Sequence, residues 1–298
     1  MNKRKLQALI NLLDDNDSFV FETVEKELLR ENHNIIPALE EKWESSFDEG
    51  CHERIENLIQ NLQFKQTKKL IKDWLKTKEH NLLEGVLLID RFQYPDLNQL
   101  KINQKIESIK NSIWLELSNS LTILEKTTIL NYFLFNVHGF SINHMNINSP
   151  QNCFLNQVLE TKKGNPFSIS ILYTIIARLL GLSAQFIDFP RNPLIAIVDS
   201  DLARKVHGNA RNSDVLFYIN PSNKGAITSR KEIEYHLNKN NYTPLEEYTK
   251  PKTDTYLIQS HLGFLKKAYQ SLGFSEKEEK IKSLYNLFKG TPKNNYSV

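Results

Sequence analysis

The chain has 298 residues, of which 40% are hydrophobic and 24% are charged, with a formal net charge of +3. This length and apolar content allow one large core or about two ordinary ones, so a disordered chain is not expected. The small positive surplus is spread along the chain and does not indicate a nucleic-acid-binding protein.

The sequence also lacks the signs of export, membrane insertion and metal binding through thiolates. No segment has the roughly 20 continuous apolar residues of a membrane span, and the first residues lack a signal-peptide core. Two cysteines occur, Cys51 and Cys153, without CxxC spacing, which argues against a disulfide framework and a thiolate metal site. A cytoplasmic protein without a cofactor is predicted.

The first part of the chain has a helical pattern. From Lys5 to Asn136 apolar residues recur at helical spacing. The segment from Asp14 to Ser18 interrupts the first helix and supplies short polar side chains that cap the second. The rhythm of short helices that follows is typical of HEAT-like repeats, and an irregular helical bundle is an equal alternative.

The helical pattern of apolar residues stops at the loop from Asn136 to Gln151, which is rich in Asn and His. A strongly apolar helix is predicted over Ile169–Leu180, and it ends at Gly181, where a left-handed C-cap would fall. Three short segments rich in β-formers predict a small antiparallel sheet packed on that helix: Ser183–Phe189, Leu194–Asp199 and Val215–Ile219.

The end of the chain predicts a pair of helices, Leu257–Leu272 and Glu276–Phe288, joined near Gly273. The whole pattern is that of a mostly helical α+β protein. The predicted domains are a helical, HEAT-like domain over 1–136, an α+β domain over 150–248, and a C-terminal helix hairpin over 255–290 that packs on the rest.

Several motifs occur in order in two segments, LNQVLETKKGNPFSISILYTIIARLLGLSAQFIDFP and FYINPSNKG. The first has a Gly-x-Pro-x-Ser helix start and an Arg-x-x-Gly-Leu turn, and the second ends a strand with Asn-Pro ahead of a glycine. Together with their helical lead-in, these segments resemble the SirB family of transglutaminase-like proteins over most of the chain. The resemblance implies that the α+β domain over 150–248 is a transglutaminase-like domain.

Active members of the wider superfamily carry a Cys at the start of the core helix, then a His and an Asp on the strands that follow. The thiolate attacks an acyl carbon, the imidazole moves the proton, and the carboxylate orients the imidazole. Laid over that pattern, these positions fall at Pro166, Asn192 and Asn220. Proline has no nucleophile and asparagine does not titrate near neutrality, so the resemblance implies a degenerate triad and a pseudoenzyme.

The predicted function is therefore a non-catalytic module that binds a protein or peptide, in a scaffolding or regulatory role, without membrane or nucleic acid. The candidate ligand groove is formed by Asn165, Pro166, Ser168, Asn192 and Asn220. The alternative is a hydrolase or amidase with a rearranged site that uses Cys153, Ser168 or His207.

Other polar residues have simpler explanations. Ser168 and Ser170 lie at the helix start, where capping explains them better than nucleophilic attack. Cys51 and His52 are adjacent and would point about 100° apart on a helix. No HxxxH or HExxH spacing joins the loop histidines His138, His144 and His207, so no metal site is predicted.

Overall fold

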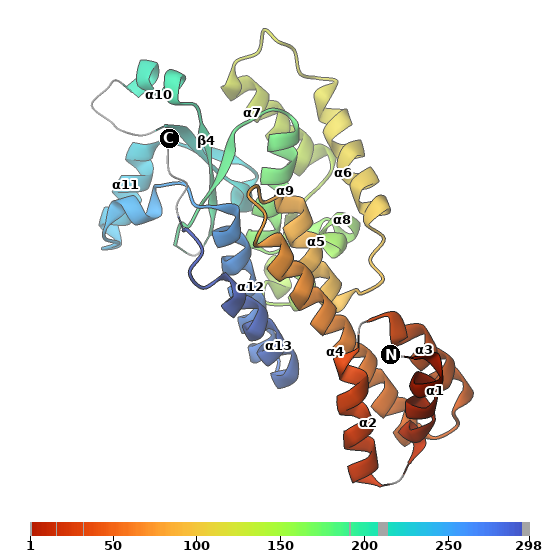
Figure 1. The fold of residues 1–298 in the computed structure, drawn as a ribbon. Helices are drawn as coiled ribbons and strands as arrows, with labels where there is room; N and C mark the ends of the chain where they lie inside the picture. Colours follow the sequence, from red (N-terminus) through yellow and green to blue (C-terminus); the bar gives the residue numbers. More distant parts are fainter. Residues whose placement is uncertain (1, 16, 32, 191, 208–213, 294–298) are drawn as a thin grey trace. The chain divides into compact units, whose positions relative to one another are not determined.

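The computed structural model describes residues 2–15, 17–31, 33–190, 192–207 and 214–293. The chain divides into two compact units (Figure 1). Unit 1 consists of Met1–Lys76 and Arg91–Pro95, and unit 2 consists of Thr77–Asp90 and Asp96–Val298. The division therefore falls well before the loop from Asn136 to Gln151, and most of the predicted helical segment after Lys76 belongs to the same unit as the sheet.

The described part of unit 1 is built from helices. They are α1 (Lys3–Asn11), α2 (Ser18–Arg30), α3 (Ile36–Ser45) and α4 (Glu49–Trp74), with 3-10 turns η1 (Leu12–Asp14) and η2 (His33–Ile35). Asp17 caps α2 by accepting the Phe19 amide hydrogen at 2.8 Å, in keeping with the predicted break at Asp14 to Ser18. The core of unit 1 lies where the first half of α4 meets the three shorter helices, around Leu28, Leu39 and Ile55.

Unit 2 combines helices from three stretches of the chain with a small sheet. Its helices are α5 (Leu82–Gln93, whose last turn lies in unit 1), α6 (Gln99–Trp114), α7 (Ile123–Tyr132), α8 (Leu155–Thr161), α9 (Pro166–Leu179), α10 (Ser200–His207), α11 (Arg230–Lys239), α12 (Asp254–Ser271) and α13 (Ser275–Tyr285). A π-helical turn, η3 (Phe133–Val137), extends α7, and 3-10 turns η4 (His144–Asn146), η5 (Pro150–Cys153), η6 (Pro221–Asn223), η7 (Leu245–Tyr248) and η8 (Asn286–Phe288) fill the loops.

The main sheet is an antiparallel meander in the order β3-β4-β5-β6. Its strands are β3 (Ala184–Ile187), β4 (Leu194–Val198), β5 (Val215–Asn220) and β6 (Ala226–Thr228). The first three match the predicted segments. A separate parallel pair joins β1 (Ser141–Ile142) to β2 (Lys163–Gly164) within the boundary region. The mostly helical α+β class is confirmed.

Helix α9 is the centre of unit 2. Nearly all of its residues are buried, and it contacts β3, β4, α6, α8 and the turn η6. It starts at Pro166, three residues before the predicted Ile169, and the chain leaves it through Gly181 at φ +80°. Glycine tolerates this left-handed conformation, so the predicted C-cap is present.

The C-terminal hairpin also matches its prediction, with α12 and α13 joined through Gly273 at φ +75°. Arg178 near the end of α9 donates two hydrogen bonds, of 2.6 and 2.9 Å, to the Asp254 carboxylate at the start of α12. The same guanidinium donates to the Ala184 carbonyl at 2.8 Å. One side chain thus ties the core helix to the hairpin and to β3. Over the described ranges, no helix has both the length and the apolar character to cross a membrane.

Candidate functional site

The start of α9 is where the family resemblance predicts the nucleophile. Pro166 is the first helical residue, where its missing amide hydrogen costs nothing. Asn165 and Ser168 form a capping box, in which the Asn165 side chain accepts from the Ser168 amide at 2.9 Å and the Ser168 hydroxyl accepts from the Asn165 amide at 3.0 Å. The Ser168 hydroxyl also donates to the Asn152 carbonyl at 2.6 Å. Both side chains are thus engaged in holding the helix start.

The other two predicted positions lie at one end of the sheet. Strands β4 and β5 pair with Ile195 opposite Ile219, so Asn192, just before β4, and Asn220, at the end of β5, belong to the same end. Asn192 is exposed. Asn220 is half-buried, and its side-chain oxygen has no partner among the described residues. The turn η6 that follows Asn220 packs on α9.

A residue that sequence reasoning missed joins this end of the sheet. Because Ile187 pairs with Leu194, Asp188 directly follows β3 at the same end as Asn192. Its carboxylate accepts a hydrogen bond from the Tyr256 hydroxyl of α12. The signal was present in the sequence as an acidic residue immediately after an apolar strand.

Cys153 lies against the start of α9. The Asn165 amide nitrogen donates to Cys153 Sγ at 3.0 Å, so one asparagine caps α9 with its oxygen and contacts the thiol with its nitrogen. Burial raises the pKa of Cys153, and the Asp90 carboxylate raises it further, while the Asn165 hydrogen bond opposes both. The thiol therefore stays protonated at neutral pH, and the thiolate is the reactive form.

His261 of α12 approaches the same region from another direction. It is completely buried, and neither ring nitrogen has a hydrogen-bond partner among the described residues. Burial lowers the pKa of His261 to about 4. The nearby Cys153 backbone partly opposes this shift, but it is not positioned to form a hydrogen bond with the ring. The imidazole is therefore neutral at physiological pH.

Asp90 of α5 completes this set. Its carboxylate accepts the Leu155 and Asn156 amide hydrogens at 3.0 and 2.8 Å, which caps the start of α8. Burial raises the pKa of Asp90 to about 7, against the effect of the two amide hydrogens. We call Asp90, Cys153, Asn165, Ser168 and His261 the buried polar cluster.

The buried polar cluster holds a thiol, an imidazole, a carboxyl and an amide, the groups that cysteine hydrolases use. Each of its residues is at most 1% exposed. A substrate has no route to the sulfur without local opening of the fold. The hydrogen bonds of Asp90, Asn165 and Ser168 in this cluster cap the starts of α8 and α9.

The remaining candidates differ in their surroundings. Ser170 is buried with no partner for its hydroxyl among the described residues. His138 Nε2 lies 2.8 Å from the Ser112 hydroxyl, and burial lowers its pKa. His144 is exposed, and the side chain of His207 lies outside the described residues. In the part of the chain that the structure describes, no three metal-binding side chains converge.

Cys51 and His52 have separate partners in unit 1. The Cys51 thiol donates to Asp14 at 3.1 Å, whereas the His52 ring lies 4.8 Å from that of Trp43. The two side chains do not form a catalytic pair.

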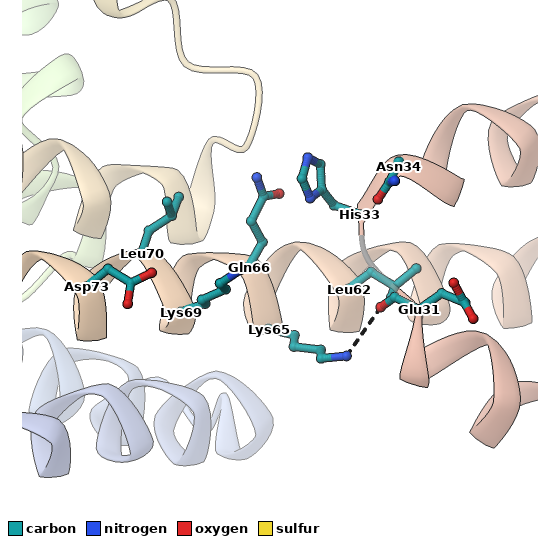
Figure 2. Close-up of a pocket in the computed structure, with 9 residues that line it drawn as sticks. All are labelled: Glu31, His33, Asn34, Leu62, Lys65, Gln66, Lys69, Leu70 and Asp73. Carbon is teal, nitrogen blue, oxygen red and sulfur yellow. Dashed lines mark hydrogen bonds between the residues drawn. The ribbon is translucent and has the colours of Figure 1, made fainter. Parts of the chain in front are cut away.

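Unit 1 also has a surface pocket of about 570 Å³ between the α2–α3 connection and α4 (Figure 2). Figure 2 shows Gln66 and Leu70 rising from α4 with His33 beside them. Lys65 turns back to the end of α2, where its ammonium donates to the Leu29 carbonyl at 2.8 Å and the Glu31 carbonyl at 3.2 Å. That lysine therefore serves as a helix cap rather than as a free cation.

Comparison with known proteins gives relatives that match part of the chain. The chain is 32% identical over 120 residues to a UPF0162 protein of Xylella fastidiosa, a match that covers 40% of this chain and 43% of that protein. It is 26% identical over 178 residues to human F-box only protein 21, covering 51% of this chain and 27% of that protein. The chain thus spans less than half the length of these relatives. No solved structure gives a significant match.

A family match places the region around α9 in a known superfamily. Residues 100–263 match the family described as the transglutaminase-like superfamily. This span runs from α6 through the sheet to α12 and includes Pro166, Asn192 and Asn220. The match covers more than half of the sequence, and the chain therefore belongs to the transglutaminase-like superfamily.

Proposed function

We propose that the protein is a non-catalytic member of its superfamily that binds a protein or peptide, as a scaffold or regulator. The main support for the proposal is that Pro166, Asn192 and Asn220 stand at the three positions where the family resemblance predicts catalytic residues. Proline at the core-helix start has no nucleophile, and Asn192 and Asn220 have no group that exchanges protons near neutrality. A fold can persist without its chemistry.

The state of Cys153 supports the same proposal. This thiol contacts the start of α9, which makes it the candidate for a displaced nucleophile. It is buried, its pKa is raised, and the nearby imidazole of His261 has a lowered pKa. A protonated thiol beside a poor proton acceptor is a weak nucleophile.

The predicted groove residues differ in how a ligand could reach them. Asn165 and Ser168 are buried and occupied with capping α9, whereas Asn192 is exposed and Asn220 is half-buried. We therefore propose that the Asn192–Asn220 end of the sheet supplies the ligand contacts and that the other residues support it. Membership of the SirB branch and a cytoplasmic location are part of the same proposal.

The test measures thiol access and turnover together. Native protein is treated with iodoacetamide and analysed by mass spectrometry, with fully denatured protein as the control. We expect neither cysteine to be alkylated in the native state and both to be alkylated after unfolding, because both are buried. We also expect no burst of p-nitrophenol from p-nitrophenyl acetate that depends on Cys153.

The alternative function, a cysteine hydrolase with a rearranged site, is favoured by one observation, the presence of Cys153, Asn165 and His261 in one buried cluster. It predicts rapid alkylation of Cys153 in the folded protein. It also predicts an acyl burst that Cys153→Ala abolishes. Those two results together would replace the binding proposal with the enzymatic one.

A further inference from the structure

A surface made of two neighbouring pockets lies along one face of α12 in unit 2. Two adjoining pockets, of about 370 and 320 Å³, share Ser260 and Tyr285 as lining residues. The first extends to Phe167 at the start of α9 and to Asp188 at the end of β3. The second extends to the segment after α13, from Lys289 to Lys293. We call this surface the α12 groove.

The length of the α12 groove suits an extended peptide. From Tyr256 to Lys267 the helix rises about 16 Å, which corresponds to about five residues of extended chain. Gly263 lines the first pocket beside Tyr285, and an added Cβ there would be in van der Waals contact with the Tyr285 ring at 3.4 Å.

The lining of the α12 groove is basic. Lys266, Lys267, Lys289 and Lys293 all lie along it, and none forms an ion pair with another described residue. The acidic lining residue, Asp188, already accepts the Tyr256 hydroxyl and lies near the buried Lys252. The four ammonium groups are therefore available to an anionic partner.

Aromatic rings lie next to these lysines. Phe167 and Phe264 pack with their ring centroids 5.7 Å apart, and both rings are half-buried at the pocket wall. An apolar side chain that covers these two rings would remove apolar surface from water, which favours binding. The lining thus combines an apolar contact with lysines on its rim.

We propose that the α12 groove binds an extended acidic segment of a partner protein, with an apolar side chain against Phe167 and Phe264 and carboxylates at Lys266 and Lys267. This inference rests on the proposed binding role and names the chemistry of the partner, and the groove meets the Asn192–Asn220 end of the sheet at Asp188. A nucleic acid fits less well, because the Asp188 carboxylate lies within the groove and the described lining residues include no arginine for bidentate phosphate contacts.

The test is fluorescence anisotropy with the full chain and a short fluorescein-labelled peptide that alternates glutamate and phenylalanine. We expect saturable binding that weakens as salt rises, because the contacts are exposed charges. The double variant Lys266→Glu/Lys267→Glu should weaken binding at least roughly 10-fold. Ser260→Trp should weaken it by filling the position shared by both pockets, with no change in net charge.

The matched control is Lys231→Glu/Lys239→Glu, which makes the same charge change at exposed lysines of α11 outside the groove. Equal loss of binding in the control would overturn the assignment to this groove. Tighter binding of a lysine-phenylalanine peptide or of a single-stranded oligonucleotide would overturn the acidic-peptide chemistry. Absence of peptide binding would overturn this inference, whereas the proposed non-catalytic role fails on a different readout, the alkylation and acyl burst at Cys153.

Discussion

At the scale of single residues, Asp90 and His261 have opposite effects on stability as pH changes. His261 takes a proton near pH 6.5 in the unfolded chain but only at about 4 in the folded one, so its contribution to stability is lost as pH falls through that interval. Asp90 loses its proton near 3.8 when unfolded but at about 7 when folded, so it costs stability as pH rises through that interval. Between pH 4 and 6.5 the two effects oppose each other.

Substituting one residue of this pair should reveal the effect of the other on the pH dependence of stability. In Asp90→Asn, the free energy of unfolding should rise with pH between 4 and 6.5 more steeply than in the wild type, because His261 then acts alone. In His261→Gln it should fall over the same range. Urea denaturation at several pH values measures both. Glu84→Gln, an exposed position on the same helix as Asp90, is the control, and parallel profiles for all the variants would contradict the assignment.

Gly225, the last residue of FYINPSNKG, is required for two reasons at once. It has φ +76°, and an added Cβ would lie 2.4 Å from the Asn131 side chain. Asn131 donates to the Gly225 carbonyl at 2.7 Å and accepts from the Tyr173 hydroxyl at 2.8 Å, so it links α7 and α9 to the turn after β5. The glycine that ends this sequence motif is therefore required by the packing against Asn131.

A pair of glycine variants separates these two reasons. Gly139 has a similar φ of +73° but nothing within 4 Å of an added Cβ. Gly225→Ala should therefore reduce the free energy of unfolding by about 1–3 kcal/mol more than Gly139→Ala, the difference being the clash with Asn131. Chemical denaturation of the two variants measures it. Equal losses would show that backbone conformation alone explains the glycine.

At the scale of elements, the Arg178–Asp254 contact decides how α9 and α12 meet, and these helices form part of the α12 groove. Arg178→Lys keeps the charge but loses the planar fork, so it should cost about 1–2 kcal/mol of stability. Arg204→Lys, in an exposed pair with Asp201, should have almost no effect. Denaturation midpoints test this contrast, and a similar loss in both variants would contradict it.

The elements that the sequence pattern predicted are those with long apolar runs or clear end signals. Helix α9 has a proline at its first position and glycine after its end, and β3 to β5 are apolar segments between loops. Strand β6 was missed because it has only three residues, of which Ala226 and Ile227 are exposed, and the feature that defines it is its pairing with β5. Helices α10 and α11 were missed because few of their residues are apolar, with Ile233 and Leu237 the buried positions of α11.

At the scale of the whole molecule, the two compact units predict separable effects of core mutations. Leu28 is fully buried in the core of unit 1. Leu28→Ala should destabilise that unit by about 2–5 kcal/mol, while the anisotropy titration of the α12 groove in unit 2 stays unchanged under native conditions. Thermal unfolding followed together with peptide binding checks this. Loss of peptide binding below the first transition would contradict the independence of the units.

The division into domains over 1–136, 150–248 and 255–290 stays a prediction. Limited proteolysis tests it, since cleavage within 136–150 would support the predicted boundary, whereas first cleavage near Lys76 would follow the division between the compact units.

The sequence by itself determined the helical character of the chain, the position of α9, the strands that follow and the absence of a nucleophile at Pro166. These properties depend on local periodicity, on cap residues and on side-chain chemistry, which neighbouring residues carry. The tertiary structure alone decided that Asn165 contacts Cys153, that Asp90 caps a helix 65 residues further on, and that His261 lies beside them. Those contacts join segments that are distant in the sequence. The pKa shifts of Asp90, Cys153 and His261 follow from burial, so no local sequence pattern predicts them.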